Sequence, residues 1–138
     1  RTRPVSRRTA SASLGLADTS LFIAVEQARP LLASPSARIA VSVITVGELR
    51  LGVLAASDGA SRARRLVTLL RAEALEPLSI DSSVAHAWAT LRLALRDAGR
   101  RMPLNDSWIA ATAIAHRMPV VSQDDDYADV PGLIVIKV

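Results

Sequence analysis

Short apolar runs alternate with helical patterns along nearly the whole chain. Five runs have the length and apolar character of buried strands, at residues 14–17, 39–44, 75–80, 120–122 and 133–138. Helical patterns occur at residues 20–29, 45–56, 60–72, 81–98 and 106–117. Such alternation is typical of a mostly parallel sheet with helices on both faces. The sequence therefore predicts a single α/β domain built on a five-stranded sheet.

Some boundaries of these elements are marked by individual residues. Pro77 has no N–H to donate to a neighbouring strand, so the run at residues 75–80 is expected at an edge of the sheet. Thr45 and Glu48 have the spacing of a capping box, in which each side chain satisfies a backbone N–H at the start of a helix. Asp81 is a favoured N-cap, and Gly99 suits the end of the same helix.

Four acidic residues follow the predicted strands or begin the helices behind them: Asp18, Glu48, Asp106 and Asp124. In a parallel sheet these positions lie along one edge, where open α/β sheets bind ligands. Four carboxylates gathered there would repel one another unless a cation neutralised them. Mg²⁺ or Mn²⁺, which prefer oxygen ligands, would do so. The sequence thus predicts a metal site.

Each acid also has an ordinary structural interpretation. Asp18 and Asp106 could cap the helices that follow them. Glu48 could serve only as the capping partner of Thr45, and Asp124 could belong to a solvated acidic turn. For any one acid alone the structural interpretation is preferred. Their joint placement favours the metal site, because capping requires no charge and Ser, Thr or Asn would serve equally well.

Composition excludes several other classes of site. The 138-residue chain is long enough for one domain, and it contains no cysteine for disulfides, thiolate zinc sites or nucleophilic catalysis. His86 is expected on the solvent face of its helix, and His116 at the opposite end of its helix from Asp106, which disfavours zinc. No run approaches the roughly 18 apolar residues of a membrane span. The first residues also lack the apolar core of a secretory signal, so a soluble, cytoplasmic protein is expected.

The net charge of +4 is concentrated at the start of the chain. Arg1, Arg3, Arg7 and Arg8 account for it, and the other 13 basic residues match the 13 acidic ones. Residues 1–13 form a basic arm that is expected to be disordered. The arm could contact phosphates, but a solvated start, a misassigned start codon or a cloning remnant is the favoured interpretation.

Four segments resemble the motifs of PIN-domain ribonucleases. They are Asp-Thr-Ser at residues 18–20, Thr-Val-Gly-Glu-Leu at 45–49, Asn-Asp-Ser-Trp-Ile-Ala-Ala-Thr-Ala at 105–113, and Val-Ser-Gln-Asp-Asp-Asp-Tyr at 121–127. Their order and spacing are more specific than any one of them, and the second and third are the most telling. The resemblance extends over residues 14–138 and points to the VapC toxins of bacterial VapBC toxin–antitoxin pairs.

The resemblance implies a three-layer α/β/α sandwich with a five-stranded, mostly parallel sheet. It also implies an endoribonuclease that depends on Mg²⁺ or Mn²⁺ and cleaves structured RNA such as tRNA or rRNA. The metal-site acids would be Asp18, Glu48, Asp106 and Asp124. The hydroxyls of Ser20 and Ser122 would hold these carboxylates in place.

The fourth motif departs from the usual pattern, Thr-x-Asp-x-Asp-Phe. Here it reads Ser-Gln-Asp-Asp-Asp-Tyr at residues 122–127, which leaves open whether Asp124 or Asp126 is the fourth acid. The resemblance also implies a homodimer and a small VapB-like antitoxin that blocks the site. A groove for the antitoxin is expected on the apolar helices between residues 45 and 72.

Arginines on two predicted helices could face the RNA. They are Arg62, Arg64, Arg65 and Arg71 on one helix, and Arg92, Arg96 and Arg100 on another. A solvated helical face and contacts with phosphates are both open interpretations. Because the chain has one Phe, one Tyr and two Trp, recognition of RNA shape is favoured over stacking on single-stranded bases.

Two other functions are compatible with acids at strand ends. A receiver-type phosphoacceptor domain would need paired acids after the first strand and a lysine near the last strands. Asp18 stands alone, however, and the only lysine is Lys137 at the end of the chain. A catalytically inactive PIN-like binding module is the other alternative, and the presence of all four acids disfavours it.

Overall fold

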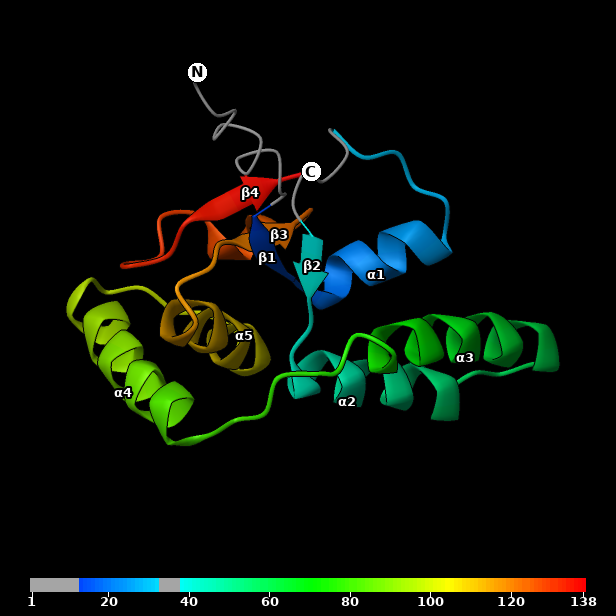
Figure 1. Cartoon of the computed structure of the whole chain (residues 1–138). Coiled ribbons are helices and arrows are strands. Elements are labelled where there is room, and N and C mark those ends of the chain that lie inside the picture. Colours follow the sequence, from blue (N-terminus) through cyan, green and yellow to red (C-terminus); the bar gives the residue numbers. More distant parts are fainter. Residues whose placement is uncertain (1–12, 33–37) are drawn as a thin grey trace, which may run out of the picture.

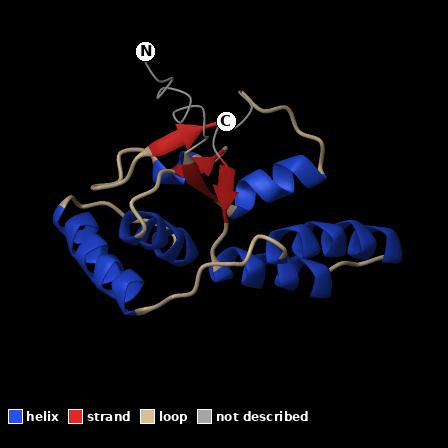
Figure 2. Cartoon of the chain, in the orientation of Figure 1, coloured by secondary structure: helices blue, strands red, loops and turns tan. Residues whose placement is uncertain are grey.

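The computed structural model describes residues 13–32 and 38–138, and its parallel sheet has the strand order β2-β1-β3-β4 (Figures 1 and 2). The strands are β1 (Leu14–Ala17), β2 (Arg38–Ala40), β3 (Val120–Ser122) and β4 (Val135–Lys137). The helices are α1 (Thr19–Glu26), α2 (Val43–Leu54), α3 (Gly59–Glu73), α4 (Ser82–Asp97), α5 (Leu104–Ala115) and the 3₁₀ turn η2 (Asp125–Tyr127).

Alternate residues of the strands enter two separate cores. Leu16 and Val120 point to one face of the sheet and pack with α4 and α5, whereas Ala17 and Val121 point to the other and pack with α1, α2 and α3. This follows from the two-residue period of a strand, whose buried positions are apolar on both faces in a parallel sheet. Helices on both faces make the three-layer α/β/α sandwich, as predicted (Figure 1).

The third of the five predicted strands, at residues 75–80, is reduced to a single bridge. Leu78 donates its N–H to the Val41 carbonyl at 2.8 Å, and its own carbonyl accepts from the N–H of Val43 at 3.0 Å. Pro77 cannot donate, and Glu76 has a φ of 55°, so the chain cannot extend the pairing on the side that precedes Leu78. The described residues therefore form four strands, and the bridge lies at the β2 edge, where Pro77 indicated an edge position.

The capping box predicted at Thr45 is wrong. The strand β2 ends four residues earlier than expected, at Ala40. Ser42 is the N-cap of α2, and its hydroxyl accepts from the N–H of Ile44 at 3.0 Å. Thr45 is buried inside the helix. Glu48 is thus released from capping and is available for other contacts.

Other predicted boundaries have mixed outcomes. Asp81 caps α4 by accepting from the N–H of Val84 at 3.0 Å, and Gly99 follows that helix with a φ of +65°, both as predicted. By contrast, α5 begins at Leu104, so Asp106 lies in its first turn and is not its cap. An acid in the first turn is favoured by the helix dipole and leaves its carboxylate free to face outward.

Three further expectations concern the rest of the chain. His86 is exposed, and His116 lies at the end of α5 opposite to Asp106, both as predicted. Of the arm at residues 1–13, only Ser13 lies within the described residues. Among the helices in the described part of the chain, none has the length and apolar character needed to cross a bilayer.

Candidate metal centre

Asp18 lies at the carboxyl end of β1 and is 3% exposed. Its Oδ1 accepts from the Ser20 hydroxyl at 2.8 Å and from the N–H of Leu21 at 3.2 Å, and the latter bond caps α1. Its Oδ2 accepts from the hydroxyl of Ser122 at 2.8 Å. The carboxylate is therefore held by donors from one helix, α1, and one strand, β3, and its capping role coexists with its place at the sheet edge.

Burial raises the pKa of Asp18 above its ordinary value, because the anion is removed from water. The hydrogen bonds from Ser122, Ser20 and the N–H of Leu21 act in the opposite direction. The nearby Asp124 carboxylate raises the pKa further by repulsion. An adjacent cation would favour the ionised form that these donors hold in place.

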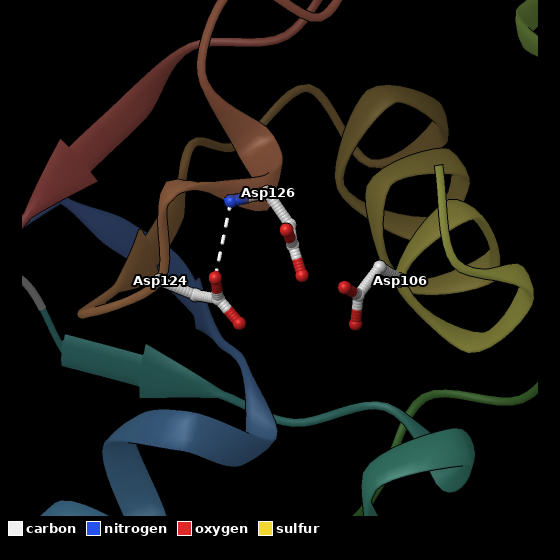
Figure 3. Close-up of side chains that lie close together, drawn as sticks. All are labelled: Asp106, Asp124 and Asp126. Atoms are coloured by element: carbon white, nitrogen blue, oxygen red, sulfur yellow. Dashed lines mark hydrogen bonds between the residues drawn. The ribbon is translucent and has the colours of Figure 1, made fainter. Parts of the chain in front are cut away.

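Ser122, the last residue of β3, joins Asp18 to the acidic turn that follows. While its hydroxyl donates to Asp18, the same oxygen accepts from the N–H of Asp124 at 2.7 Å. The side chain of Asp124 in turn accepts from the N–H of Asp126 at 3.1 Å and so caps η2 (Figure 3). This turn directs Asp124 and Asp126 toward Asp106 on α5 (Figure 3).

Asp106, Asp124 and Asp126 form the tightest acidic cluster among the described residues. Each offers a carboxylate oxygen, and these oxygens all lie within 4.8 Å of one another (Figure 3). Burial and the hydrogen-bonded, like-charged Asp126 raise the pKa of Asp106 to about 7. Without a cation, the carboxyl group of Asp106 therefore keeps its proton up to near-neutral pH.

Tyr127 lies beneath this cluster and is fully buried. Its hydroxyl donates to Oδ1 of Asp106 at 3.2 Å. Burial raises the pKa of the Tyr127 phenol above its ordinary value of 10, and the carboxylates of Asp18, Asp106 and Glu48 raise it further. The carboxylates of Asp18, Glu48 and Asp106 therefore all act on one phenolic oxygen, which remains protonated and can only donate to a carboxylate.

Glu48 lies beside the cluster and is held by two donors. Its Oε1 accepts from the Thr19 hydroxyl at 2.6 Å, and its Oε2 accepts from the amide of Asn105 at 3.3 Å. Thr19 also shares a 3.0 Å hydrogen bond with the hydroxyl of Thr45. The side chain that was expected to cap α2 thus links α1, α2 and the start of α5.

The four predicted acids therefore lie at one edge of the sheet, but at different distances from one another. Asp106 and Asp124 are in the tight cluster, Asp18 is joined to Asp124 through Ser122, and Glu48 is at the side. The cluster also includes Asp126, which the sequence left as an alternative to Asp124. A short 3₁₀ turn places both on the same side, and the Asp-x-Asp spacing is the sequence signal for this arrangement.

The donor set fits a hard divalent cation. Mg²⁺ binds oxygen at ~2.0–2.1 Å, so oxygens that surround one ion lie within roughly 4.2 Å of one another. The 4.8 Å spread of the three carboxylates requires only small side-chain rotations to meet this. Histidine and cysteine ligands are absent from the described cluster, which disfavours zinc and agrees with Mg²⁺ or Mn²⁺.

The chain is similar to known ribonucleases along most of its length. Residues 16–133 match the PIN domain. Ribonuclease VapC4 of Mycobacterium tuberculosis is 52% identical over 128 residues, which cover 89% of this chain and 95% of the relative. Ribonuclease VapC5 of the same organism is 45% identical over 125 residues, covering 90% and 93% of the two chains.

Solved structures share the fold. A chain of VapBC-5, a member of the VapBC family of toxin-antitoxin systems from Mycobacterium tuberculosis, superposes with a TM-score of 0.82 at 42% identity, covering 91% of this chain and 99% of that one. A chain of FitAcB from Neisseria gonorrhoeae superposes with a TM-score of 0.69 at 29% identity, covering 89% and 96%.

Proposed function

Since the chain belongs to the PIN-domain family, in its VapC branch, we propose that it is an endoribonuclease toxin that depends on Mg²⁺ or Mn²⁺. The observation that carries this proposal is the cluster of Asp106, Asp124 and Asp126 at the carboxyl edge of the sheet. The cluster offers only oxygen ligands, which suit the cation. Relatives of the chain are named ribonucleases. Structured RNA such as tRNA or rRNA is the proposed substrate.

The acids divide into two groups by how they are held. Asp106, Asp124 and Asp126 would ligate the cation directly, since their oxygens are mutually close. Asp18 would ligate it or fix the position of a coordinated water, because its own donors prevent it from rotating. When bound, the cation supplies electrophilic stabilisation of the phosphate and lowers the pKa of a water molecule.

Glu48 is the proposed proton-handling residue. Thr19 and Asn105 orient its carboxylate beside the cluster without belonging to it. A carboxylate in this position can accept a proton from the attacking water through a hydrogen bond. The oxygen that Asn105 donates to is exposed toward solvent, which provides a path for release of that proton.

A VapB-like antitoxin is the proposed protein partner. The solved structure of VapBC-5, which resembles this chain, is of a member of the VapBC family of toxin-antitoxin systems. Helices α2 and α3 expose several large apolar side chains that a partner could cover: Leu51, Leu54, Val67 and Leu70. This surface falls within residues 45–72, where the groove was expected. A homodimer is also proposed, on the basis of the family alone.

Cleavage of purified RNA with and without divalent cation tests the proposal. Transcripts of tRNA and rRNA segments should be cut when Mg²⁺ or Mn²⁺ is added and should stay intact in EDTA. Calorimetric titration with Mn²⁺ should show binding that Asp18→Asn weakens. A binding module with no catalytic function would show neither cleavage nor Mn²⁺ binding sensitive to this change.

A further inference from the structure

Four arginines line a depression at the end of α4 and in the loop that leads to α5. The cavity measures about 480 Å³ and is partly open to solvent. Its arginines are Arg92, Arg96, Arg100 and Arg101. The buried side chains of Leu95 and Met102 form its apolar floor. We call this depression the arginine cavity.

The arginine cavity adjoins the acidic cluster. Arg100 donates from Nη2 to the backbone carbonyl of Asp126 at 3.1 Å. The loop that carries Arg100 and Arg101 leads directly into α5, whose first turn holds Asp106. The cavity therefore lies next to the two segments that hold Asp106 and Asp126.

The guanidinium groups of the cavity are partly preorganised. Arg92 lies over the Trp88 ring, 5.7 Å from its centroid, and Trp88 stacks on Trp108 with centroids 4.3 Å apart. The Trp88 indole also donates to the buried hydroxyl of Ser107 at 3.0 Å. This stacked pair fixes the ring on which Arg92 rests, so the binding of an anion by Arg92 costs less side-chain entropy.

The charge in the cavity is largely uncompensated. No carboxylate is among the described residues that line it. Asp97 pairs with Arg96 at 3.2 Å, but the two side chains are 63% and 75% exposed, and such a pair contributes little. A phosphate could replace Asp97 at Arg96 at a small cost in free energy, and the apolar floor would strengthen its attraction to the guanidinium groups.

The arginines of α3 are used differently. Arg62 donates to the carbonyl of Ala56 at 3.0 Å, and Arg65 donates to the carbonyl of Gly52 at 2.7 Å. Both therefore join α3 to the end of α2. The two groups of arginines, which the sequence did not distinguish, therefore have different surroundings. Two arginines of α3 bond to backbone carbonyls, whereas those on α4 and in the loop after it line the arginine cavity.

We propose that the arginine cavity binds the phosphate backbone of the RNA beside the scissile bond. The proposal rests on the ribonuclease function proposed above and assigns it a backbone-binding subsite. Several closely spaced guanidiniums suit a chain of phosphates, which carry one negative charge per nucleotide. The acidic cluster would repel the same backbone, so cationic contacts next to it are needed to hold the strand.

The test measures RNA binding and not cleavage. A fluorescein-labelled tRNA transcript is titrated with the whole chain in EDTA, which prevents cleavage, at several salt concentrations. The double variant Arg96→Gln/Arg101→Gln removes two cavity charges and leaves Arg100 on the Asp126 carbonyl. The double variant Arg64→Gln/Arg71→Gln removes the same charge from exposed positions on α3 and serves as the matched control.

The cavity variant should bind about tenfold more weakly at ~0.1 M salt. The slope of log affinity against log salt should fall by about 0.7–0.9 for each phosphate that the variant no longer neutralises. The control should stay within about twofold of the wild type.

Several outcomes would overturn the proposal. Equal effects of the two variants would do so, as would tighter binding of an acidic peptide than of RNA. If inorganic phosphate displaced the labelled tRNA as effectively as unlabelled tRNA does, the cavity would be a simple anion site. That result would also overturn the proposal. If RNA is cleaved but the cavity changes have no effect, only the subsite fails; if the wild type neither binds nor cleaves RNA, the proposed function fails.

Discussion

The hydroxyl of Tyr127 donates to Oδ1 of Asp106 across 21 residues of sequence, at 3.2 Å and without exposure to solvent. This contact joins η2 to the first turn of α5 and holds one member of the acidic cluster from below. The phenol remains protonated, so it stabilises the ionised form of Asp106 and never competes for the cation.

Tyr127→Phe should weaken metal binding while preserving the fold. The hydrogen bond from Tyr127 lowers the pKa of Asp106, so its removal should raise that pKa above about 7 and leave more of the carboxyl protonated at neutral pH. Mn²⁺ affinity should fall several-fold at pH 7 and recover toward that of the wild type at pH 8.5. Unchanged affinity at pH 7 would mean that the hydroxyl does not position Asp106. The circular dichroism spectrum is the control for folding.

Asp18→Asn and Asp106→Asn should each abolish Mg²⁺-dependent RNA cleavage. Each change removes a negative charge from the cluster without altering the shape of the side chain, so the fold should persist. RNA cleavage by both variants is compared with that of the wild type, and near-ultraviolet circular dichroism confirms tertiary packing. Full activity in either variant would show that the altered residue is not needed at the metal.

Neutralising each of the three acids of the last motif in turn distinguishes the proposed metal ligands, Asp124 and Asp126, from the acid between them, Asp125. Asp124→Asn and Asp126→Asn should each reduce Mn²⁺ affinity at least tenfold, because both carboxylates lie in the tight cluster. Asp125→Asn is the matched control, since Asp125 is exposed and pairs with Lys137 outside the cluster. Isothermal titration calorimetry measures the Mn²⁺ affinity of the three variants. Reduced affinity in the Asp125 variant would contradict the assignment of Asp124 and Asp126 as the ligands of this motif.

The metal-free protein should become less stable as the pH rises through 7. The pKa of Asp106 is raised from 3.8 to about 7 in the folded state, so between these values the folded protein binds a proton that the unfolded chain has released. The stabilising effect of this bound proton is complete below pH 3.8 and disappears as the pH rises through about 7. The Tm in EDTA should therefore fall between pH 6 and pH 8.

This pH dependence has two controls. Saturating Mg²⁺ should raise the Tm most at pH 8, where the acids are ionised, because binding to the folded state adds stability. Asp106→Asn, which cannot titrate, should show a flatter Tm profile in EDTA over the same range. An equally steep profile in this variant would assign the pH dependence to other groups.

Ser122→Ala should affect both the stability and the metal site. It removes the donor at 2.8 Å from the buried Asp18 carboxylate and the acceptor of the Asp124 N–H. Removal of a hydrogen bond to a buried charge lowers the free energy of unfolding by about 1–3 kcal/mol. Urea denaturation should show this decrease in EDTA, whereas Ser61→Ala, at an exposed helix start, should show a smaller one.

Much of the architecture was available from the sequence. Alternation of strand and helix patterns determined the α/β/α layers, because periods of two and 3.6 residues dictate which faces are buried. Asp81 and Gly99 marked the ends of α4 because these effects are local. The position of acids after strands predicted that Asp18, Asp106 and Asp124 would share one edge of the sheet.

Only the tertiary structure decided how these residues meet. Ser42 replaced Thr45 as the cap because the chain turns where Leu78 bridges to the end of β2, a contact between distant segments. That contact, and not any local propensity, sets the start of α2 and frees Glu48. In the same way Tyr127 reaches Asp106 only after η2 packs on α5. Residue types and local periodicity specify the elements, whereas the exact partners of each carboxylate depend on packing between segments that the sequence separates.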